Sequence, residues 1–540
     1  MLRAGLLDDP GRASTARVEF VLLLIEGSQE VCELERFLKK STGRPRGLSV
    51  KAILAALLLL ATDDRPLTLK SVTELVYFKC SDEDRERLGI KGPRETDSFS
   101  ALYRRVRYLF HLICDEVDPS PLPKNICVAN EVLSQRSKPI DEAEISARSA
   151  RLLRLCNSLV DQSVRLMSQD ELGCYDGSIG LDATPVPLFS RGPSKTRGVC
   201  ASDPDGGWYV REGDHRDTED QNGRRRTKIA WALEATIATM AQIERGSGHK
   251  HPNLALGFVM SKPGEDPGGM GAKVLGSVAS RGYKPGFVGA DRAYSSANPE
   301  GFHLPLKALG YSLVMDYRID QLGRQMNSAG ALLIEGGWYC PKMPEPLIDA
   351  TLELRNGKVG RDLYEKRIAA RGMYTLRRKQ GPDKDGYERW SCPATGRYPK
   401  VTCPLRPSSL STGDAKIKVL GSEEELRPTI CRQSAVTIAP DVGVRHRQEL
   451  RFATDEWHER YATLRNSIEG LNGYLKDPCH EALSQPGRRR VRGIAPQSIF
   501  VTVLLMAANI RKIKGFREEK AYRLKPQRPK RRRATLTAYA

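Results

Sequence analysis

The feature that most constrains this chain is the stretch 457–476, which carries two adjacent stripes when it is read as a helix. One stripe is apolar and has the i, i+4, i+7, i+11 spacing of a face that packs on a core: Leu464, Ile468, Leu471 and Leu475. The other is polar and lies about 100° further round the helix: Tyr461, Arg465, Glu469, Asn472 and Lys476. The stretch predicts a half-buried helix that holds a carboxylate between two cations at the edge of its buried face.

The polar stripe allows two interpretations. An exposed Arg465–Glu469 ion pair would add only about 0.2–0.5 kcal/mol, and Arg before Glu is the less favourable order. Gly470 and Gly473 each cost about 1 kcal/mol relative to alanine in a helix interior, which suggests close approach by another group. The second interpretation is a carboxylate that helps to hold a metal ion while the cations meet an anionic substrate. It requires partner carboxylates elsewhere in the chain.

The α/β segment of the sequence offers two such partners. Asp182 lies in the middle of a predicted strand, where aspartate is disfavoured. Asp291 follows another predicted strand, at the edge where α/β folds place ligand-binding groups. Asp176, at a turn, and Asp316, at a strand end, are weaker competitors. Asp182, Asp291 and Glu469 together would make an oxygen-rich site of the kind that Mg²⁺ or Mn²⁺ takes.

The order of patterns along the chain predicts several parts. Helices are expected at 48–62, 68–78 and 98–117, and strands at 178–188, 228–240, 286–291 and 311–316 are interleaved with helices at 269–281 and 299–309. The expected parts are an all-α N-terminal domain (1–135), a connecting helix (136–175), a first α/β part (176–335), a partly β insertion with strand candidates at 388–392, 399–402 and 415–420 (336–446), a second α/β part (447–515) and a basic disordered tail (516–540).

Charge indicates the class of partner. The formal net charge is +20, which favours nucleic acid or another polyanion. In the N-terminal domain, Arg104, Arg105 and Arg107 lie away from the apolar side of the helix 98–117. We interpret this side as a DNA-binding face, and a solvated basic helix that packs on the rest of the protein is the alternative.

Apolar runs and cysteines indicate the compartment. The runs at 52–61 and 20–25 are shorter than the roughly 18–20 residues of a membrane span, so we expect no span and a cytoplasmic protein with reduced cysteines. Within the insertion, Cys340, Cys392, Cys403 and Cys431 could form a four-thiolate zinc site. Their spacing is irregular and lacks a Cys-x-x-Cys pair, so we favour core or turn positions over zinc.

Three segments carry a family resemblance: Ile179-Gly-Leu-Asp182-Ala-Thr, Val288-Gly-Ala-Asp291-Arg-Ala-Tyr294, and Arg465-Asn-Ser-Ile-Glu469-Gly-Leu-Asn-Gly-Tyr-Leu-Lys476. The chain resembles bacterial insertion-sequence transposases of the DDE class, in the branch with a Tyr-Arg-Glu-Lys signature. Arg465 and Lys476 match the spacings of that signature around Glu469. Tyr461 departs by one residue, because three residues and not two separate it from Arg465.

The resemblance implies a fold and a function. The fold would be a ribonuclease H-like (RNase H-like) α/β catalytic domain with a partly β insertion, preceded by the all-α N-terminal domain. Asp182, Asp291 and Glu469 would be catalytic and hold Mg²⁺ or Mn²⁺. Arg465 and Lys476, with Tyr461 and Asn472, would contact the DNA of the transposon end. The expected activity is cleavage at element ends and strand transfer into target DNA, by a homodimer or larger assembly on double-stranded DNA.

Two other functions fit the same residues. One is a catalytically inactive DNA-binding protein derived from a transposase. The other is an RNase H-like nuclease that cuts DNA without joining it.

Overall fold

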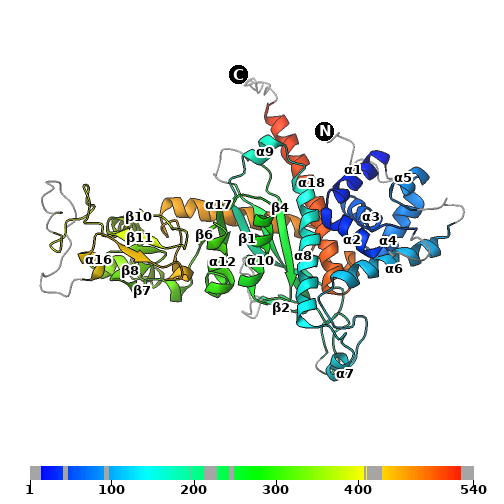
Figure 1. Ribbon diagram of the computed structural model, residues 1–540, viewed down its shortest axis with the longest axis horizontal. Coiled ribbons are helices and arrows are strands. Elements are labelled where there is room, and N and C mark those ends of the chain that lie inside the picture. Colours follow the sequence, from blue (N-terminus) through cyan, green and yellow to red (C-terminus); the bar gives the residue numbers. More distant parts are fainter. Residues whose placement is uncertain are drawn as a thin grey trace, which may run out of the picture.

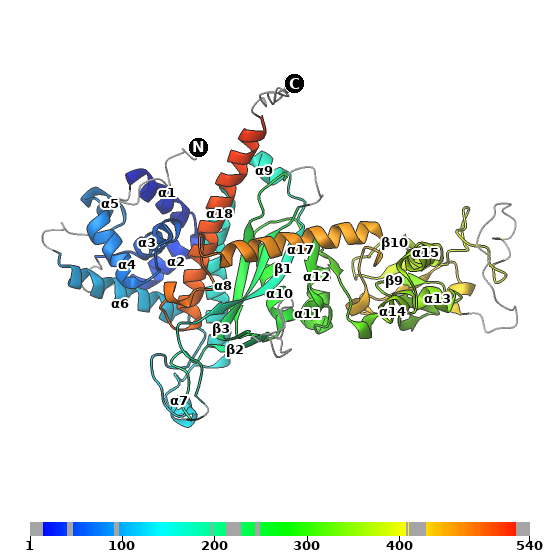
Figure 2. The ribbon, with the colours of Figure 1, turned by 180° about the vertical axis from the view of Figure 1, so that it is seen from behind.

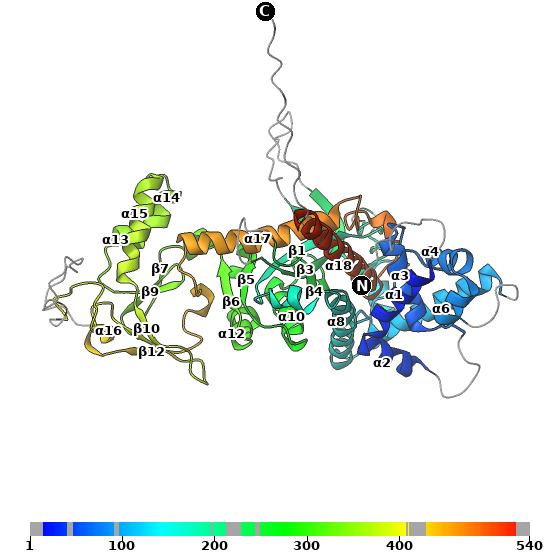
Figure 3. The ribbon, with the colours of Figure 1, turned by 90° about the horizontal axis from the view of Figure 1, so that it is seen from above.

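The structure is a computed structural model that describes residues 14–39, 47–90, 97–194, 196, 198–211, 228–242, 249–406, 409 and 428–524. Three parts lie in a row, as Figures 1 and 3 show. Helices of the N-terminal part form one end, a sheet with covering helices forms the middle, and the inserted part forms the other end. The predicted strand at 415–420 and the last residues of the chain, 525–540, lie outside the described residues.

The N-terminal part is entirely helical. Its helices and the connecting helices that follow are α1 (Thr15–Glu26), α2 (Gln29–Leu38), α3 (Val50–Thr62), α4 (Leu69–Glu74) with its π-helical continuation (Leu75–Lys79), α5 (Asp82–Arg87), α6 (Phe99–Val117), α7 (Asn130–Gln135), α8 (Glu142–Val164) and α9 (Gln169–Gly173). Ser49, Thr68 and Ser98 accept hydrogen bonds from amides in the first turns of α3, α4 and α6, as N-caps do. These three caps confirm the predicted helix starts.

The middle part is built on a mixed sheet. Its strands are β1 (Ile179–Pro187), β2 (Gly207–Arg211), β3 (Lys228–Met240), β4 (Ala255–Ser261), β5 (Phe287–Ala290) and β6 (Ser312–Met315). Strand β3 runs antiparallel to β1 on one side and to β2 and β4 on the other. Strands β5 and β6 continue the sheet from β1 and run parallel to it. The four strands that the sequence predicts are confirmed, and β2 and β4 are additional.

Helices pack on this sheet from several directions. They are α10 (Pro267–Ser280), α11 (Arg292–Ser295), the π-helical turn Pro299–His303 with α12 (Leu304–Ala308), α17 (Asp455–Lys476) and α18 (Ile494–Leu524). Helix α17 contacts β1, β3, β5 and β6, and in Figure 2 it runs from the sheet toward the inserted part. Helix α18 packs beside α8, α3 and β4, so it joins the sheet to the N-terminal part.

Helix α18 extends further than the sequence predicts. It continues to Leu524, into the segment 516–540 that we expected to be a disordered tail. Arg517 explains part of the extension, because its Nη2 lies 2.7 Å from Glu171 of α9. Within the described residues, one helix stretch, 494–523, is long and apolar enough to cross a membrane by length and composition, and 83% of its most apolar window is buried inside the protein.

The inserted part contains two small sheets and several short helices. The sheets are β7 (Arg324–Ser328), β8 (Ala331–Ile334) and β9 (Gly337–Tyr339), and β10 (Arg377–Gln380), β11 (Glu388–Ser391) and β12 (Val436–Ile438). The helices are α13 (Glu345–Ile348), α14 (Ala350–Arg355), α15 (Arg361–Arg371) and α16 (Thr429–Arg432). The first sheet begins at Arg324, before the predicted boundary at 336, and the residues predicted as a strand at 399–402 form bends and a single bridge.

Candidate active site

The helix that carries Glu469 lies unusually close to the sheet. A Cβ atom added at Gly180 of β1 would lie 2.6 Å from the carbonyl oxygen of Leu464, and one added at Gly289 of β5 would lie 2.4 Å from the Leu464 Cβ. Any residue other than glycine would therefore push α17 away. The predicted apolar stripe faces this contact, because Leu464, Ile468, Leu471 and Leu475 are all completely buried.

The two glycines also fix where the aspartates lie. Gly180 and Asp182 are two residues apart on one strand, so they share a face of the sheet, and this is the face that α17 covers. Strands β1 and β5 pair in register with Gly180 opposite Gly289. Continuing that register by two residues places Asp182, in the middle of β1, beside Asp291, which directly follows β5. The sheet therefore brings the two predicted acids together.

Helix α17 contacts Asp182 through its polar stripe. The Asn472 side-chain amide donates to the Asp182 Oδ2 over 3.1 Å, across 290 residues of sequence. The Arg465 guanidinium lies 4.0 Å from the Asp182 Oδ1 and donates to the Glu469 Oε1 over 2.8 Å. Arg465 thus stands between the acid of the sheet and the acid of the helix. Glu469 remains the most accessible member of the group, with 56% of its side chain exposed.

Burial has an electrostatic consequence for Asp182. Desolvation is the main cause that raises its pKa, to about 6, and the nearby carboxylate of Asp291 raises it further. The positive charges of Arg465 and Lys476 lower the pKa but do not offset the burial. Asp182 is therefore a carboxylate whose charge is poorly solvated, and a bound cation would relieve both the burial and the repulsion.

Tyr461 and Lys476 lie at the two ends of the site. Tyr461 stacks on Trp457 with ring centroids 4.8 Å apart, and burial raises its pKa to about 12. It lines a cavity of about 800 Å³ that lies between α17 and the helices of the inserted part. Burial lowers the pKa of Lys476, and the charge of Asp182 raises it. The predicted site residues of α17 thus extend along the helix, from Tyr461 beside the inserted part to Lys476 near Asp182.

The two competing acids are occupied by other partners. Asp316 accepts a hydrogen bond from the Arg292 Nε over 2.7 Å and lies 3.7 Å from Arg355 of the inserted part. Asp176 accepts a hydrogen bond from the Ser178 amide over 2.8 Å, as in a turn. Asp316 therefore pairs with two arginines, one of them from the inserted part, and Asp176 serves a turn.

Sequence reasoning missed several groups around the acids. Arg292 is half exposed, directly follows Asp291 and is held in place by Asp316. Glu234 of β3 has its pKa raised, mainly by burial and in part by the charge of Asp291. Arg211 and Lys228, where β2 ends and β3 begins, lower the pKa of Lys476 by like-charge repulsion. Arg292 could have been found in the sequence, because it directly follows Asp291. Glu234, Arg211 and Lys228 could not, because only strand pairing brings them close to the site.

Two buried polar atoms next to Asp182 indicate whether the residues around Asp182, Asp291 and Glu469 suit a metal ion. Among the described residues, Asn472 Oδ1 and Arg465 Nη1 are buried without a hydrogen-bond partner. Together with the closely placed carboxylates of Asp182 and Asp291, this fits a site that receives a cation and an anionic substrate. Within the described part of the chain, no three or more His, Cys, Asp and Glu side chains are already arranged around an ion position. In this group the reason is that Glu469 is turned toward Arg465.

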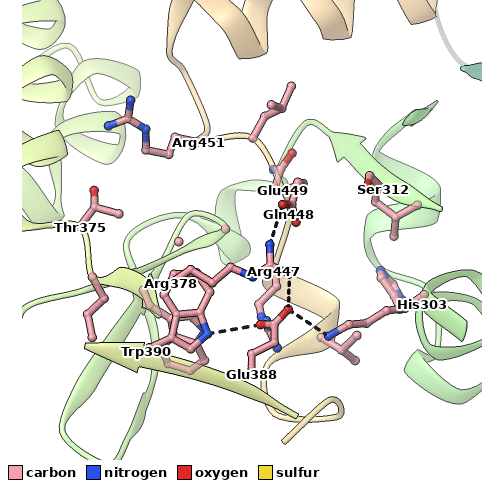
Figure 4. A pocket seen from close by; sticks show the side chains of 18 of the residues that line it. His303, Ser312, Thr375, Arg378, Glu388, Trp390, Arg447, Gln448, Glu449 and Arg451 are labelled. Carbon is pink, nitrogen blue, oxygen red and sulfur yellow. Dashed lines mark hydrogen bonds and ion pairs between the residues drawn. The ribbon is translucent and has the colours of Figure 1, made fainter. Parts of the chain in front are cut away.

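A second cavity, of about 320 Å³, lies where the inserted part meets α12 and β6 (Figure 4). Glu388 of β11 is buried in it among cations, 3.1 Å from Arg378 and 3.9 Å from Lys307 of α12. It also pairs with Arg447, on the segment that leads to α17. Glu388 therefore ties the inserted part to the sheet and to the helix that carries the candidate site.

No protein-family model, no curated protein and no solved structure matches this chain. The candidate active site is thus defined by the geometry of this chain: one acid within β1, a second directly after the neighbouring β5, a third on the helix that packs on these strands, and cations around the three.

Proposed function

We propose that this protein is a DDE transposase, which cleaves DNA at the ends of a mobile element and joins those ends to target DNA in a metal-dependent reaction. One observation carries the proposal. Helix α17 is packed on the glycines of β1 and β5, so that the Glu469 stripe lies over the paired strands where β1 carries Asp182 and β5 leads into Asp291. The acids come from segments more than a hundred residues apart in the sequence.

The architecture of the sheet supports an RNase H-like catalytic domain. If the short strand β2, which pairs with the first residues of β3, is set aside, the sheet order is β4-β3-β1-β5-β6. The first three strands in sequence are antiparallel, and the next two run parallel to β1. Asp182 then lies on the first strand and Asp291 directly after the fourth. Glu469 follows on a helix after an inserted part, as the resemblance implies.

Asp182, Asp291 and Glu469 would hold Mg²⁺ or Mn²⁺. Such ions activate a water molecule or a 3′-hydroxyl and stabilise the leaving oxygen in an in-line attack on phosphorus. The same site would therefore serve both cleavage by water and joining by a DNA 3′ end.

The remaining residues would bind and orient. Asn472 fixes the Asp182 carboxylate through its side-chain amide. Arg465 pairs with Glu469 in the free protein, and its guanidinium suits a phosphate once Glu469 turns toward a metal. The charge of Lys476 also acts on Asp182, and its ammonium group would contact a second phosphate. Tyr461 and the cavity beside it would receive the terminal nucleotides of the DNA.

The partner would be double-stranded DNA. The net charge of +20 gives a favourable, salt-dependent contribution to binding. A reaction that processes two element ends together would require a homodimer or a larger assembly on DNA.

The experiment that tests this proposal uses purified protein and a plasmid that carries the DNA flanking its gene. Cleaved and joined products are followed with Mg²⁺, with EDTA and with Glu469→Gln. Glu459→Gln is the matched control, because Glu459 lies exposed on the same helix, outside the polar stripe. We expect end-specific cleavage and joining that EDTA and Glu469→Gln abolish and Glu459→Gln retains.

Other results would favour the other functions. Cleavage without joined product would indicate a nuclease that does not transfer strands. Tight binding to the flanking DNA without any metal-dependent product would indicate an inactive DNA-binding protein. Equal activity of Glu469→Gln and the wild-type protein would remove Glu469 from the site.

A further inference from the structure

Four cysteines meet inside the inserted part, far from the candidate active site in the fold. Cys340 follows β9, Cys392 follows β11, Cys403 lies in a turn, and Cys431 lies in α16. Each is at most 5% exposed, and all four belong to one cluster of buried side chains. Within the described chain none of the four forms a disulfide. Segments spread over about ninety residues of sequence thus converge on one group of thiols.

Three of these cysteines are presented by the same local structure. Cys340, Cys392 and Cys403 each precede a proline and open a turn closed by a backbone hydrogen bond. The donor amides, three residues further on, belong to Met343, Thr395 and Arg406, at 3.1, 3.1 and 2.9 Å from the cysteine carbonyl oxygens. A single buried cysteine that only fills space needs no particular turn, so the threefold repetition points to a shared role.

Donors are directed at the sulfur atoms of two of the turns. The backbone amides of Lys342 and Ala394 donate to the sulfurs of Cys340 and Cys392, two residues before them. The Arg406 side chain also donates to the Cys392 sulfur. Hydrogen bonds of this kind favour the thiolate over the thiol. The turns therefore stabilise the form of cysteine that binds metals.

The four thiols are near enough to affect one another. Burial is the main cause that raises the pKa of Cys340 and Cys392, and it raises that of Cys431 to about 11. In each case the charge of at least one other cysteine of the group raises the pKa further, which indicates that the side chains lie close to one another.

Arg406 fixes three of the segments to one another. Besides its contact with Cys392, its guanidinium donates to the carbonyl oxygen of Ile430 over 3.2 Å and to that of Gln433, on either side of Cys431. Its own backbone closes the turn of Cys403. The relative positions of Cys392, Cys403 and Cys431 are thus set by one side chain and not only by apolar packing.

The inserted part is a small unit of the kind that a structural metal ion would stabilise. The two sheets of the inserted part have strands of three to five residues, and the cysteines lie in the loops and the short helix between them. Small β-rich units of this kind bury little apolar surface, and structural metals commonly stabilise them.

We propose that Cys340, Cys392, Cys403 and Cys431 bind a structural Zn²⁺ ion as a four-thiolate site. This reverses the preference for core positions that the irregular spacing suggested. As the thiols stand they are not yet arranged around an ion. Binding requires the four side chains to turn inward, and each thiol releases its proton to the solvent as its sulfur bonds to zinc. The site is structural and is independent of the proposed DNA chemistry.

The experiment measures zinc in the full-length protein, purified under reducing conditions and without added chelator, by elemental analysis. We expect about one Zn²⁺ per chain, the stoichiometry of a four-thiolate site. Cys403→Ser should lose it. Cys479→Ser should keep it, because Cys479 is exposed and lies outside the cluster. Asp182→Asn should also keep it, which separates this ion from any metal at the candidate active site.

Thiol reactivity gives a readout that does not depend on the variants folding. In the wild-type protein a strong zinc chelator should increase the number of thiols that react rapidly with a colorimetric reagent by about four, one for each ligand of the site. Absence of zinc, both as purified and after incubation with Zn²⁺, would overturn the proposal. Thiol reactivity that is the same with and without chelator, or a disulfide within the group, would overturn it too.

Discussion

The candidate active site of the middle part and the cysteine cluster of the inserted part gather reactive side chains in different ways. In the middle part, regular elements do so: strand register places Asp182 beside Asp291, and the helical repeat of α17 places Arg465 and Asn472 beside Asp182 with Glu469 on the same stripe. In the inserted part, turns and one arginine do so, and no periodic element carries more than one of the four cysteines. The difference teaches that spacing along the chain is informative where the backbone is periodic and misleading where it is not.

The largest expected effect concerns the acids that β1 and β5 bring together. Asp182→Asn should reduce Mg²⁺-dependent cleavage by more than about 100-fold. Residues that only hold a metal ligand in place cost up to about 100-fold when they are replaced, and a direct ligand should cost more. Asp176→Asn is the control, since Asp176 lies three residues before β1 and serves a turn. Rates of product formation on flanking DNA provide the measurement. Similar losses of cleavage activity in both variants would mean that the pairing of β1 with β5 does not distinguish Asp182 from Asp176 as a catalytic residue.

The next effect tests the close packing that positions α17. Gly289→Ala should destabilise the protein by about 1–3 kcal/mol, because the new methyl group overlaps Leu464. Gly276→Ala on α10 meets no atom within 4 Å and should be neutral or stabilising by up to about 1 kcal/mol. Chemical denaturation followed by circular dichroism compares the two. Equal stabilities would show that the glycine contact is not what holds the helix on the sheet.

A smaller effect depends on pH. The pKa of Asp182 in the folded protein is raised to about 6, above its usual 3.8, so folding disfavours the ionised form. The associated stability is present at low pH and is lost as pH rises toward 6. Without Mg²⁺, the wild-type protein should lose about 1 kcal/mol relative to Asp182→Asn between pH 5 and pH 7. Denaturation of both proteins at each pH checks this, and parallel curves would contradict it.

The smallest effect concerns a DNA contact at the edge of the site. Lys476→Gln should weaken DNA binding and reduce the slope of log affinity against log salt by about 1, because one phosphate contact is lost. Lys262→Gln is the control, because this exposed lysine follows β4, outside the predicted DNA contacts. Titrations of labelled flanking DNA at several salt concentrations measure the slopes. An unchanged slope in Lys476→Gln would place the DNA elsewhere.

The sequence predicted the strongly periodic elements and the residues that they bring together. Strand β3 begins and ends where its alternating and β-branched pattern does, and the Leu464 stripe is buried as its spacing requires. Strand β4 was missed because Ala255–Ser261 is apolar on both faces, so no alternation marks it.

Other features depend on contacts that no local pattern contains. Asp316 is paired by Arg355, which comes from the inserted part, and the hydrogen bond of Asn472 to Asp182 joins residues far apart in sequence. The cost of Gly470 and Gly473 in a helix suggested that another group approaches them closely. Among the described residues no group does so, since a Cβ atom added at either glycine would meet open space. That face of α17 is therefore open beside Glu469.

The most direct test of the central claim maps the metal itself. Fe²⁺ is substituted for Mg²⁺ in the complex of the protein with its flanking DNA, and ascorbate and peroxide then cut the chain near the bound iron. We expect cuts close to Asp182, Asp291 and Glu469 that excess Mg²⁺ suppresses and Asp182→Asn removes. Cuts at other positions, or an unchanged pattern in Asp182→Asn, would show that these three acids do not form one metal site.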